Sequence, residues 1–137
     1  MTIYVDTSAL LRRYLADRDR PMVMQAMTED PVWCGSAVSR TETLMALHQV
    51  ALNAAHHEEL WQQFRLEWDS VVEIPVDDRC LARAAEIGAR FRLRLADAIH
   101  LAAADRLPRP VSFLTLERQQ IPAAVELGFA VVSPHAN

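Results

Sequence analysis

The sequence predicts an α/β fold in which a mainly parallel sheet of about five strands is covered by helices on both faces. Short apolar runs of strand length alternate with longer segments of helical periodicity along the 137 residues, and this alternation is typical of parallel sheets. The chain is also long enough for a domain that buries roughly two-thirds of the surface exposed by an unfolded chain. The strands are expected near residues 2–5, 32–38, 71–75, 111–115 and 129–133.

Helical patterns fill the segments between these strands. Apolar residues recur along one side of the first and fourth expected helices, as they do in helices that pack on a sheet. Pro21 suits the first turn of a helix, and Gly128 suits the position that closes one. The helices are expected from about 7 to 17, near 19–28, from Ser39, from Glu58 to Asp69, from Asp77 or Asp78 to near Arg94, from about Asp97, and from Glu117 to Leu127.

The composition restricts the class of protein. No repeat, low-complexity tract or linker divides the chain, so residues 1–137 are expected to form one domain. The sequence shows neither a signal-peptide pattern nor an apolar stretch near the roughly 20 residues of a membrane span, which predicts a cytoplasmic protein with no membrane partner. Cys34 and Cys80 lack the spacing of metal ligands and are expected to be reduced.

The charges exclude further classes. A net charge of −4 argues against a protein that holds nucleic acid by bulk electrostatics, which usually requires a basic domain. A nuclease is still possible, because bound divalent ions would neutralise clustered acids locally. All 14 basic residues are Arg, which excludes a catalytic lysine and leaves Arg as the only permanently cationic side chain for phosphate contacts.

Four acidic residues stand near the starts of expected helices. Asp6 ends the apolar run Thr2-Ile3-Tyr4-Val5, and Glu42 and Glu117 each follow an expected strand within a few residues. In an open parallel sheet, ligands bind outside the carboxyl ends of the strands, so these three acids are expected on one rim. Asp97 does not directly follow a strand, and only the fold can place it there.

Each acid also has a structural interpretation. Asp6, Asp97 and Glu117 suit helix caps or first turns, and Ser39-x-x-Glu42 matches a capping box. If the acids converge, however, they repel one another unless a cation lies between them. Ligands that are all oxygen atoms favour magnesium or manganese over zinc. Convergence of the four acids therefore predicts a divalent-metal site.

The acids lie in recognisable motifs: Val5-Asp6-Thr7-Ser8-Ala9-Leu10, Arg40-Thr41-Glu42-Thr43-Leu44 and Arg94-Leu95-Ala96-Asp97-Ala98-Ile99-His100-Leu101-Ala102-Ala103-Ala104. Over essentially the whole chain the sequence resembles the PIN-domain family, specifically the small single-domain VapC-type toxin ribonucleases of bacterial toxin–antitoxin pairs. The third motif carries the most specific resemblance. Family members commonly have Asp as their fourth acid, where Phe113-Leu114-Thr115-Leu116-Glu117 supplies Glu117 instead.

The resemblance implies a PIN-like three-layer α/β/α sandwich and metal-dependent endoribonuclease activity. The first three acids would hold one or two Mg²⁺ or Mn²⁺ ions, and Glu117 would act directly or through water. Ser8 and Thr115 would orient carboxylates or waters. The catalytic and metal-binding residues are thus expected to be Asp6, Glu42, Asp97 and Glu117.

The implied partners are an RNA substrate, a cognate VapB-type antitoxin and a second copy of the chain in a homodimer. Trp61, Phe64 and Trp68 are expected in the core or at an interface. Apolar residues of the first two helices are expected either to dock the antitoxin or to pack these helices together. They are Leu10, Leu11, Tyr14, Leu15, Met22, Val23, Met24 and Met27.

Other residues and functions are interpreted more simply. His100, one helical turn after Asp97, could reach a metal-bound water but is expected to fill a helix face. Arg40, Arg92 and Arg94 are expected at the surface, where the two that flank the acidic motifs closely could contact RNA phosphates. Two alternatives to a toxin are a PIN nuclease of RNA processing and a PIN scaffold without catalysis. A haloacid-dehalogenase-type or receiver domain is excluded, because Ser8 stands where the former needs a second Asp and both need a lysine.

Overall fold

The computed structural model describes residues 2–136 and contains one five-stranded sheet in the order β3-β2-β1-β4-β5. Every neighbouring pair is parallel, with Thr2 opposite both Val32 and Val111. The predicted mainly parallel sheet of about five strands is therefore confirmed. The strands are β1 (Thr2–Val5), β2 (Val32–Ser36), β3 (Val72–Ile74), β4 (Val111–Leu114) and β5 (Ala130–Val132).

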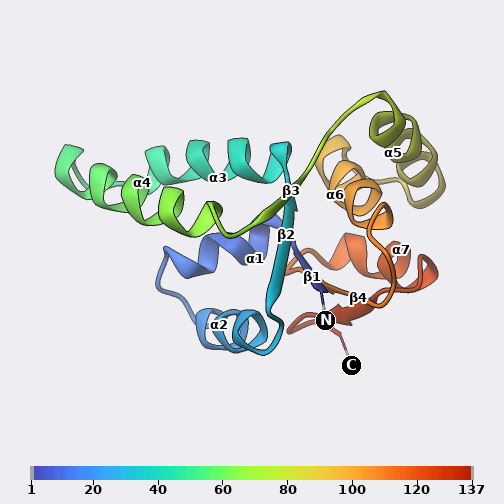
Figure 1. Cartoon of the computed structure of the whole chain (residues 1–137), viewed down its shortest axis with the longest axis horizontal. Coiled ribbons are helices and arrows are strands. Elements are labelled where there is room, and N and C mark those ends of the chain that lie inside the picture. The colour runs from blue at the N-terminus through green and yellow to red at the C-terminus, as the bar shows by residue number, and fades with distance from the viewer. Residues whose placement is uncertain (1, 137) are drawn as a thin grey trace.

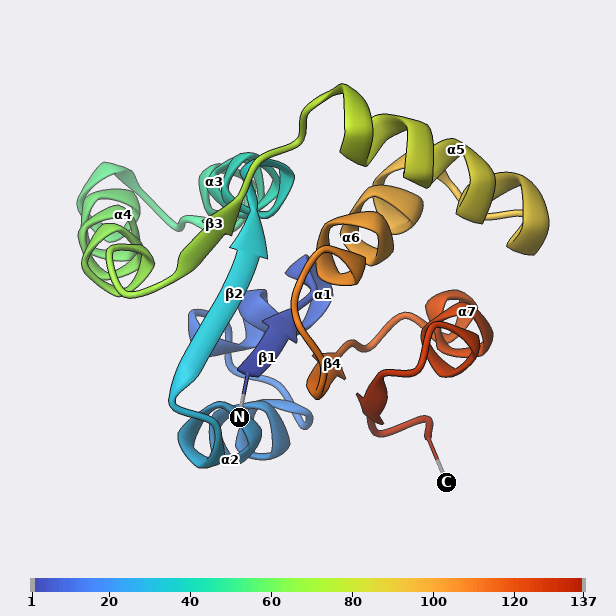
Figure 2. The same cartoon turned by 45° about the vertical axis from the view of Figure 1, so that its right-hand side comes forward.

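Helices cover both faces of this sheet, which gives the three layers expected. Figures 1 and 2 show α1–α4 on one side and α5–α7 on the other. None of these helices among residues 2–136 is long and apolar enough to cross a membrane. The helices are α1 (Thr7–Leu10), α2 (Arg20–Glu29), α3 (Ala37–Val50), α4 (Ala54–Trp68), α5 (Asp78–Phe91), α6 (Leu95–Asp105) and α7 (Ile121–Glu126), with 3₁₀ turns η1 (Leu11–Arg13) and η2 (Arg118–Gln120).

Side chains on the two faces of the central strand β1 pack into two separate hydrophobic cores. Ile3 and Val5 point into the core shared with α1–α4, whereas Tyr4 points into the core shared with α5–α7. Successive side chains of a strand alternate between faces, and Ile3, Tyr4 and Val5 are all no more than 2% exposed. A strand buried on both faces reads as a continuous apolar run, which explains the run at the N-terminus.

Several helix boundaries differ from the prediction. The first helix ends at Leu10 and continues only as η1, and Tyr14, which follows η1, packs edge-on against Phe64 with ring centroids 5.7 Å apart. The fourth helix begins at Ala54, before Glu58, with Asn53 as its cap. The last helix begins at Ile121 and not at Glu117.

The start positions of the third and last helices have identifiable physical causes. Ser36, not Ser39, caps α3: the Ser36 side chain accepts from the Ser39 amide, and the Ser39 hydroxyl accepts from the Ser36 amide. The alternative of a capping box formed by Ser39 and Glu42 is therefore wrong, and the Glu42 side chain does not cap this helix. In α7, Pro122 stands in the first turn. A proline deeper in the helix would lack the amide that donates to the preceding turn, so the helix cannot begin at Glu117.

The apolar residues of the first two helices mainly serve packing. Leu10, Tyr14, Val23 and Met27 are all at most 8% exposed and belong to the core beneath α1–α4. The packing alternative is thus the correct one for these four residues, whereas Leu11 stays half-buried. Cys34 and Cys80 are buried free thiols, as expected.

Gly35 of β2 allows the indole of Trp68 to approach the strand closely. A Cβ built on Gly35 would lie 3.0 Å from a Trp68 ring carbon and 3.4 Å from the Ser39 hydroxyl oxygen. Gly35→Ala is expected to lower the free energy of unfolding by about 1–3 kcal/mol, because the indole must move. Urea denaturation measures this change. Gly88→Ala is the matched control: its Cβ would meet nothing closer than 3.4 Å, and no loss of stability is expected there.

Candidate active site

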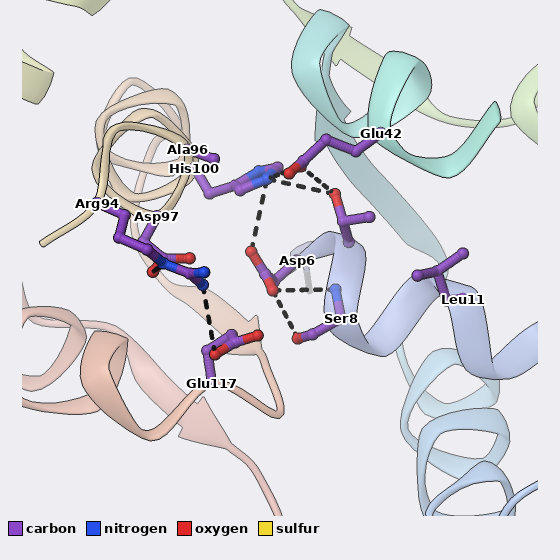
Figure 3. Close-up of a pocket in the computed structure, with 10 residues that line it drawn as sticks. Asp6, Ser8, Leu11, Glu42, Arg94, Ala96, Asp97, His100 and Glu117 are labelled. Carbon is purple, nitrogen blue, oxygen red and sulfur yellow. Dashed lines mark hydrogen bonds and ion pairs between the residues drawn. The ribbon is translucent and has the colours of Figure 1, made fainter. Parts of the chain in front are cut away.

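The four predicted acids meet in one cavity at the carboxyl ends of the strands (Figure 3). Asp6 directly follows β1, Glu42 lies in the second turn of α3 after β2, and Glu117 follows β4. Asp97 lies in the first turn of α6, which the fold brings to the same rim. The cavity has a volume of about 290 Å³. The structure therefore confirms that the four acids converge.

Asp6 is held by donors on both carboxylate oxygens. It is 2% exposed and caps α1, with Oδ2 accepting from the Ser8 amide at 3.1 Å and from the Ser8 hydroxyl at 2.6 Å. The Ser8 hydroxyl accepts in turn from the Leu116 amide at 3.0 Å, so its own hydrogen points at Asp6. The capping role and the site role of Asp6 therefore coexist, and Ser8 orients this carboxylate.

Gln120 holds the other oxygen of Asp6, and nothing in the sequence marked it. The side chain is fully buried, and its Nε2 donates to Asp6 Oδ1 at 3.1 Å and to the Asp97 carbonyl at 3.3 Å. Thr115 donates to Gln120 Oε1 at 2.6 Å and accepts from the Glu117 amide at 2.9 Å. Thr115 thus acts on Asp6 mainly through Gln120, since its own oxygen lies 3.5 Å from that carboxylate.

Glu42 is fixed through one of its two oxygens. Oε1 accepts from the Thr7 hydroxyl at 2.7 Å and lies 2.7 Å from His100 Nε2. Burial raises the pKa of the Glu42 carboxyl. The hydrogen bonds from His100 and Thr7 lower it and outweigh burial, so the pKa is below its usual value. The ionised form is therefore the one that this environment favours.

His100 does not simply fill a helix face, as the sequence had suggested. The ring is 2% exposed and forms the wall between Glu42 and Asp6, with Nε2 3.6 Å from Asp6 Oδ1. Its Nδ1 lies 2.8 Å from the Tyr4 hydroxyl. Burial lowers the pKa of this imidazole, but Tyr4, Asp6 and Glu42 raise it to well above its usual value. The one-turn spacing from Asp97 was the only signal of this position.

Arg94 lies over the remaining two acids (Figure 3). Its Nε is 3.3 Å from Asp97 Oδ2, and its guanidinium is 3.8 Å from Glu117 Oε2. The Arg94 side chain is 75% exposed, whereas that of Asp97 is 7% and that of Glu117 33% exposed. Among residues 2–136, the only cation within ion-pair distance of both acids is therefore the guanidinium of this exposed side chain.

The acids repel one another despite Arg94. Burial raises the pKa of Asp97, Arg94 lowers it, and the Asp6 charge raises it, with a net increase. Burial also raises the pKa of Glu117, and the charges of Asp97 and Asp6 add to this effect. Like charges held close in a cavity are destabilising unless a cation joins them.

The chemistry of these donors fits a hard divalent cation. Four carboxylates surround the cavity, and no cysteine lines it; such oxygen ligands suit Mg²⁺ or Mn²⁺. Within residues 2–136, no three His, Cys, Asp or Glu side chains are already arranged as a coordination shell. Arg94, His100 and Gln120 hold the carboxylates instead.

The repulsion predicts a specific pH dependence for the metal-free protein. Because Asp97 and Glu117 have raised pKa values in the folded state, their contribution to stability falls as pH rises from their unfolded to their folded pKa values. A variant with Asp97→Asn and Glu117→Gln should therefore melt above the wild type at pH 7. This advantage should shrink as pH falls toward about 4, near the usual carboxyl values. Thermal melts in chelator measure it; a difference independent of pH would contradict the repulsion.

The fold and the site define a class: α/β proteins with an acidic pocket at the carboxyl ends of a parallel sheet. The PIN domain matches residues 3–109 of this chain. The chain belongs to the PIN-domain family.

Known relatives extend this likeness over nearly the full length. The chain is 27% identical over 135 residues to ribonuclease VapC47 of Mycobacterium tuberculosis (strain CDC 1551 / Oshkosh), covering 98% of each chain. The fold is similar to that of FitAcB from Neisseria gonorrhoeae, with a TM-score of 0.75, 17% identity and coverage of 98% and 99% of the two chains. A toxin–antitoxin complex from Klebsiella pneumoniae matches with a TM-score of 0.73, 20% identity and the same coverage.

Proposed function

We propose that this protein is the toxin of a VapBC-type toxin–antitoxin pair, a single-domain endoribonuclease that depends on Mg²⁺ or Mn²⁺. The observation that carries the proposal is the convergence of Asp6, Glu42, Asp97 and Glu117 on one cavity. The full-length likeness to a ribonuclease of the VapC type supports the same activity. Action on cellular RNA corresponds to the cytoplasmic location expected from the sequence.

The proposed role of each residue follows from its position in the cavity. Asp6, Glu42 and Asp97 would bind the metal directly, and Glu117, which lies on the non-helical segment just before η2, would reach it through water. A bound divalent ion would acidify an attacking water and stabilise the charge that develops on the phosphate and the leaving oxygen. Ser8 and Gln120 keep Asp6 oriented in advance, which removes the need to reorganise it during reaction.

Arg94 is the residue placed to meet the RNA backbone. Its guanidinium is exposed beside the buried acids and is close to Asp97 and Glu117. Once a metal ion neutralises these acids, the guanidinium is free to donate two hydrogen bonds to a phosphate. A contact of this kind positions RNA without reading its sequence.

The proposed protein partners are an antitoxin and a second copy of the chain. Leu11 lies at the wall of the acidic cavity and is half-buried, so an antitoxin segment bound over the cavity would contact it. Met27 is only 1% exposed, so a charge there would test folding and not binding. A structure of similar fold is that of a toxin–antitoxin complex from Klebsiella pneumoniae.

The test is an RNA cleavage assay with a labelled single-stranded or loop-containing RNA. The purified chain should cleave with Mn²⁺ or Mg²⁺ and stop in chelator. Co-expression with the product of a short adjacent reading frame should give a stable complex with suppressed cleavage. Cleavage that persists in chelator would overturn the metal mechanism. Cleavage without such a partner would favour a nuclease of RNA processing, and tight partner binding without any cleavage would favour a scaffold.

Leu11→Asp should weaken that complex by at least tenfold in dissociation constant, because a charge would be buried against an apolar contact. Val125→Asp is the matched control, since Val125 is a 61% exposed apolar residue on α7. Isothermal titration or competition binding measures both variants. Equal affinity of the two variants and the wild type would place the antitoxin on another surface.

A further inference from the structure

We propose that His100, held by Tyr4, is a positioning residue that fixes Glu42 so that one carboxylate oxygen is available to the metal. This inference rests on the proposed metal-dependent function. His100 touches none of the reacting atoms in this role; it acts through Glu42. The contacts that carry it link β1, α1, α3 and α6.

The direction of the hydrogen bond at Nε2 follows from its partner. A carboxylate oxygen only accepts, so the 2.7 Å contact with Glu42 Oε1 requires the hydrogen to be on His100 Nε2. Thr7 donates to the same oxygen at 2.7 Å. Oε1 therefore receives two donors, while Oε2 makes no hydrogen bond to any group in residues 2–136. The two oxygens of Glu42 are thereby distinguished.

Tyr4 fixes the other side of the imidazole ring. Its hydroxyl lies 2.8 Å from Nδ1, and its ring meets the His100 ring edge-on with centroids 5.9 Å apart. Tyr4 is fully buried and stacks on Phe113 at 5.5 Å, so the phenol cannot swing away. The Ser39 hydroxyl lies 3.4 Å from the same nitrogen. The imidazole is therefore clamped at both nitrogens.

Glu42 needs such a clamp more than Asp6 and Asp97 do. The Glu42 side chain is 35% exposed, whereas the side chains of Asp6 and Asp97 are 3% and 7% exposed. A longer and more exposed carboxylate samples more rotamers, and ordering it on metal binding costs conformational entropy. Residues that orient a ligand in this way commonly change metal affinity or activity by about 10- to 100-fold when removed.

The test measures Mn²⁺ affinity of the full chain by electron paramagnetic resonance or titration calorimetry. His100→Asn removes the donor to Glu42 and should weaken Mn²⁺ binding by about 10- to 100-fold. His100→Gln places an amide nitrogen near the Nε2 position and should restore binding to within about threefold of the wild type. Tyr4→Phe should weaken binding less than His100→Asn and add nothing to it in the double variant.

Two controls separate positioning from general damage to the core. Tyr14→Phe alters another buried tyrosine, in the core beneath α1–α4, and should leave Mn²⁺ affinity unchanged. In a Glu42→Ala background, His100→Asn should have no further effect on Mn²⁺ affinity, whereas a structural role would still lower it. If His100→Asn fails to fold by circular dichroism, Tyr4→Phe with and without Glu42→Ala makes the same comparison.

The outcomes separate this inference from the proposed function. Absence of Mn²⁺ binding by the wild type overturns the metal-dependent function, and the positioning role with it. Normal wild-type binding together with unchanged affinity in the His100 and Tyr4 variants overturns the positioning role alone. A loss of affinity that persists in the Glu42→Ala background shows that His100 acts on the cavity generally and also overturns it.

Discussion

Asp6→Asn should reduce metal-dependent RNA cleavage by about a thousandfold, equivalent to roughly 4 kcal/mol of transition-state stabilisation. Asp6 is the most enclosed of the four acids, and both of its oxygens are oriented by Ser8 and Gln120. Asn keeps the shape and caps a helix as well as Asp does, so α1 should remain intact. The substitution therefore removes the charge and the acceptor for Gln120 Nε2 while keeping the cap of α1.

Asp77→Asn is the matched control for this variant. Asp77 caps α5 and accepts from the Cys80 amide at 3.0 Å, as Asp6 accepts from Ser8, but it lies outside the acidic cavity. Single-turnover cleavage of a labelled RNA in Mn²⁺ should be lost in Asp6→Asn and kept in Asp77→Asn. Retained cleavage in Asp6→Asn, with thermal stability equal to that of the wild type, would exclude Asp6 as a metal ligand.

Asp97→Asn should lower cleavage by at least about a hundredfold, and Glu117→Gln by only about tenfold. Asp97 is short, buried and anchored in the first turn of α6. Glu117 has a longer side chain that is 33% exposed, and it lies just before η2 on a non-helical segment. A residue so placed is better suited to hold a water than to bind the ion directly.

The comparison uses the same cleavage assay with circular dichroism to verify folding. Both variants also lose a partner of Arg94, so an effect of the ion pair alone would be shared by the two. The difference between them therefore reports on the distance of each carboxylate from the metal. Equal and complete loss in both folded variants would make Glu117 a direct ligand.

Several features of this protein follow from local sequence alone. The continuous apolar run before Asp6 predicts a strand buried on both faces, and the structure places it at the centre of the sheet. Gly128 ends the last helix with φ 87°, a backbone conformation that glycine adopts without steric cost. Asp6, Glu42 and Glu117 were predictable as neighbours, because parallel strands direct their carboxyl ends to one rim.

Helix boundaries were harder to predict from the sequence, because tertiary contacts compete with local preference. Ser39 and Glu42 satisfy the pattern of a capping box, but Ser36 forms the better one because β2 ends there. Tyr14 fits a longer first helix, yet α1 ends at Leu10 and continues only as η1 to Arg13. In both cases a local signal was present and the helix boundary still fell elsewhere.

The partners of the acids were decided by tertiary structure alone. His100 lies 58 residues from Glu42, and Gln120 lies 114 residues from Asp6. The one-turn spacing from Asp97 was the only local sign for His100, and Gln120 carried none. The strand order β3-β2-β1-β4-β5 sets β1 between β2 and β4, and only then do α3, α6 and η2 meet around Asp6. The sequence by itself determined which carboxylates could form the site; the packing of α3, α6 and η2 determined which side chains hold them, because those contacts exist only once distant segments are side by side.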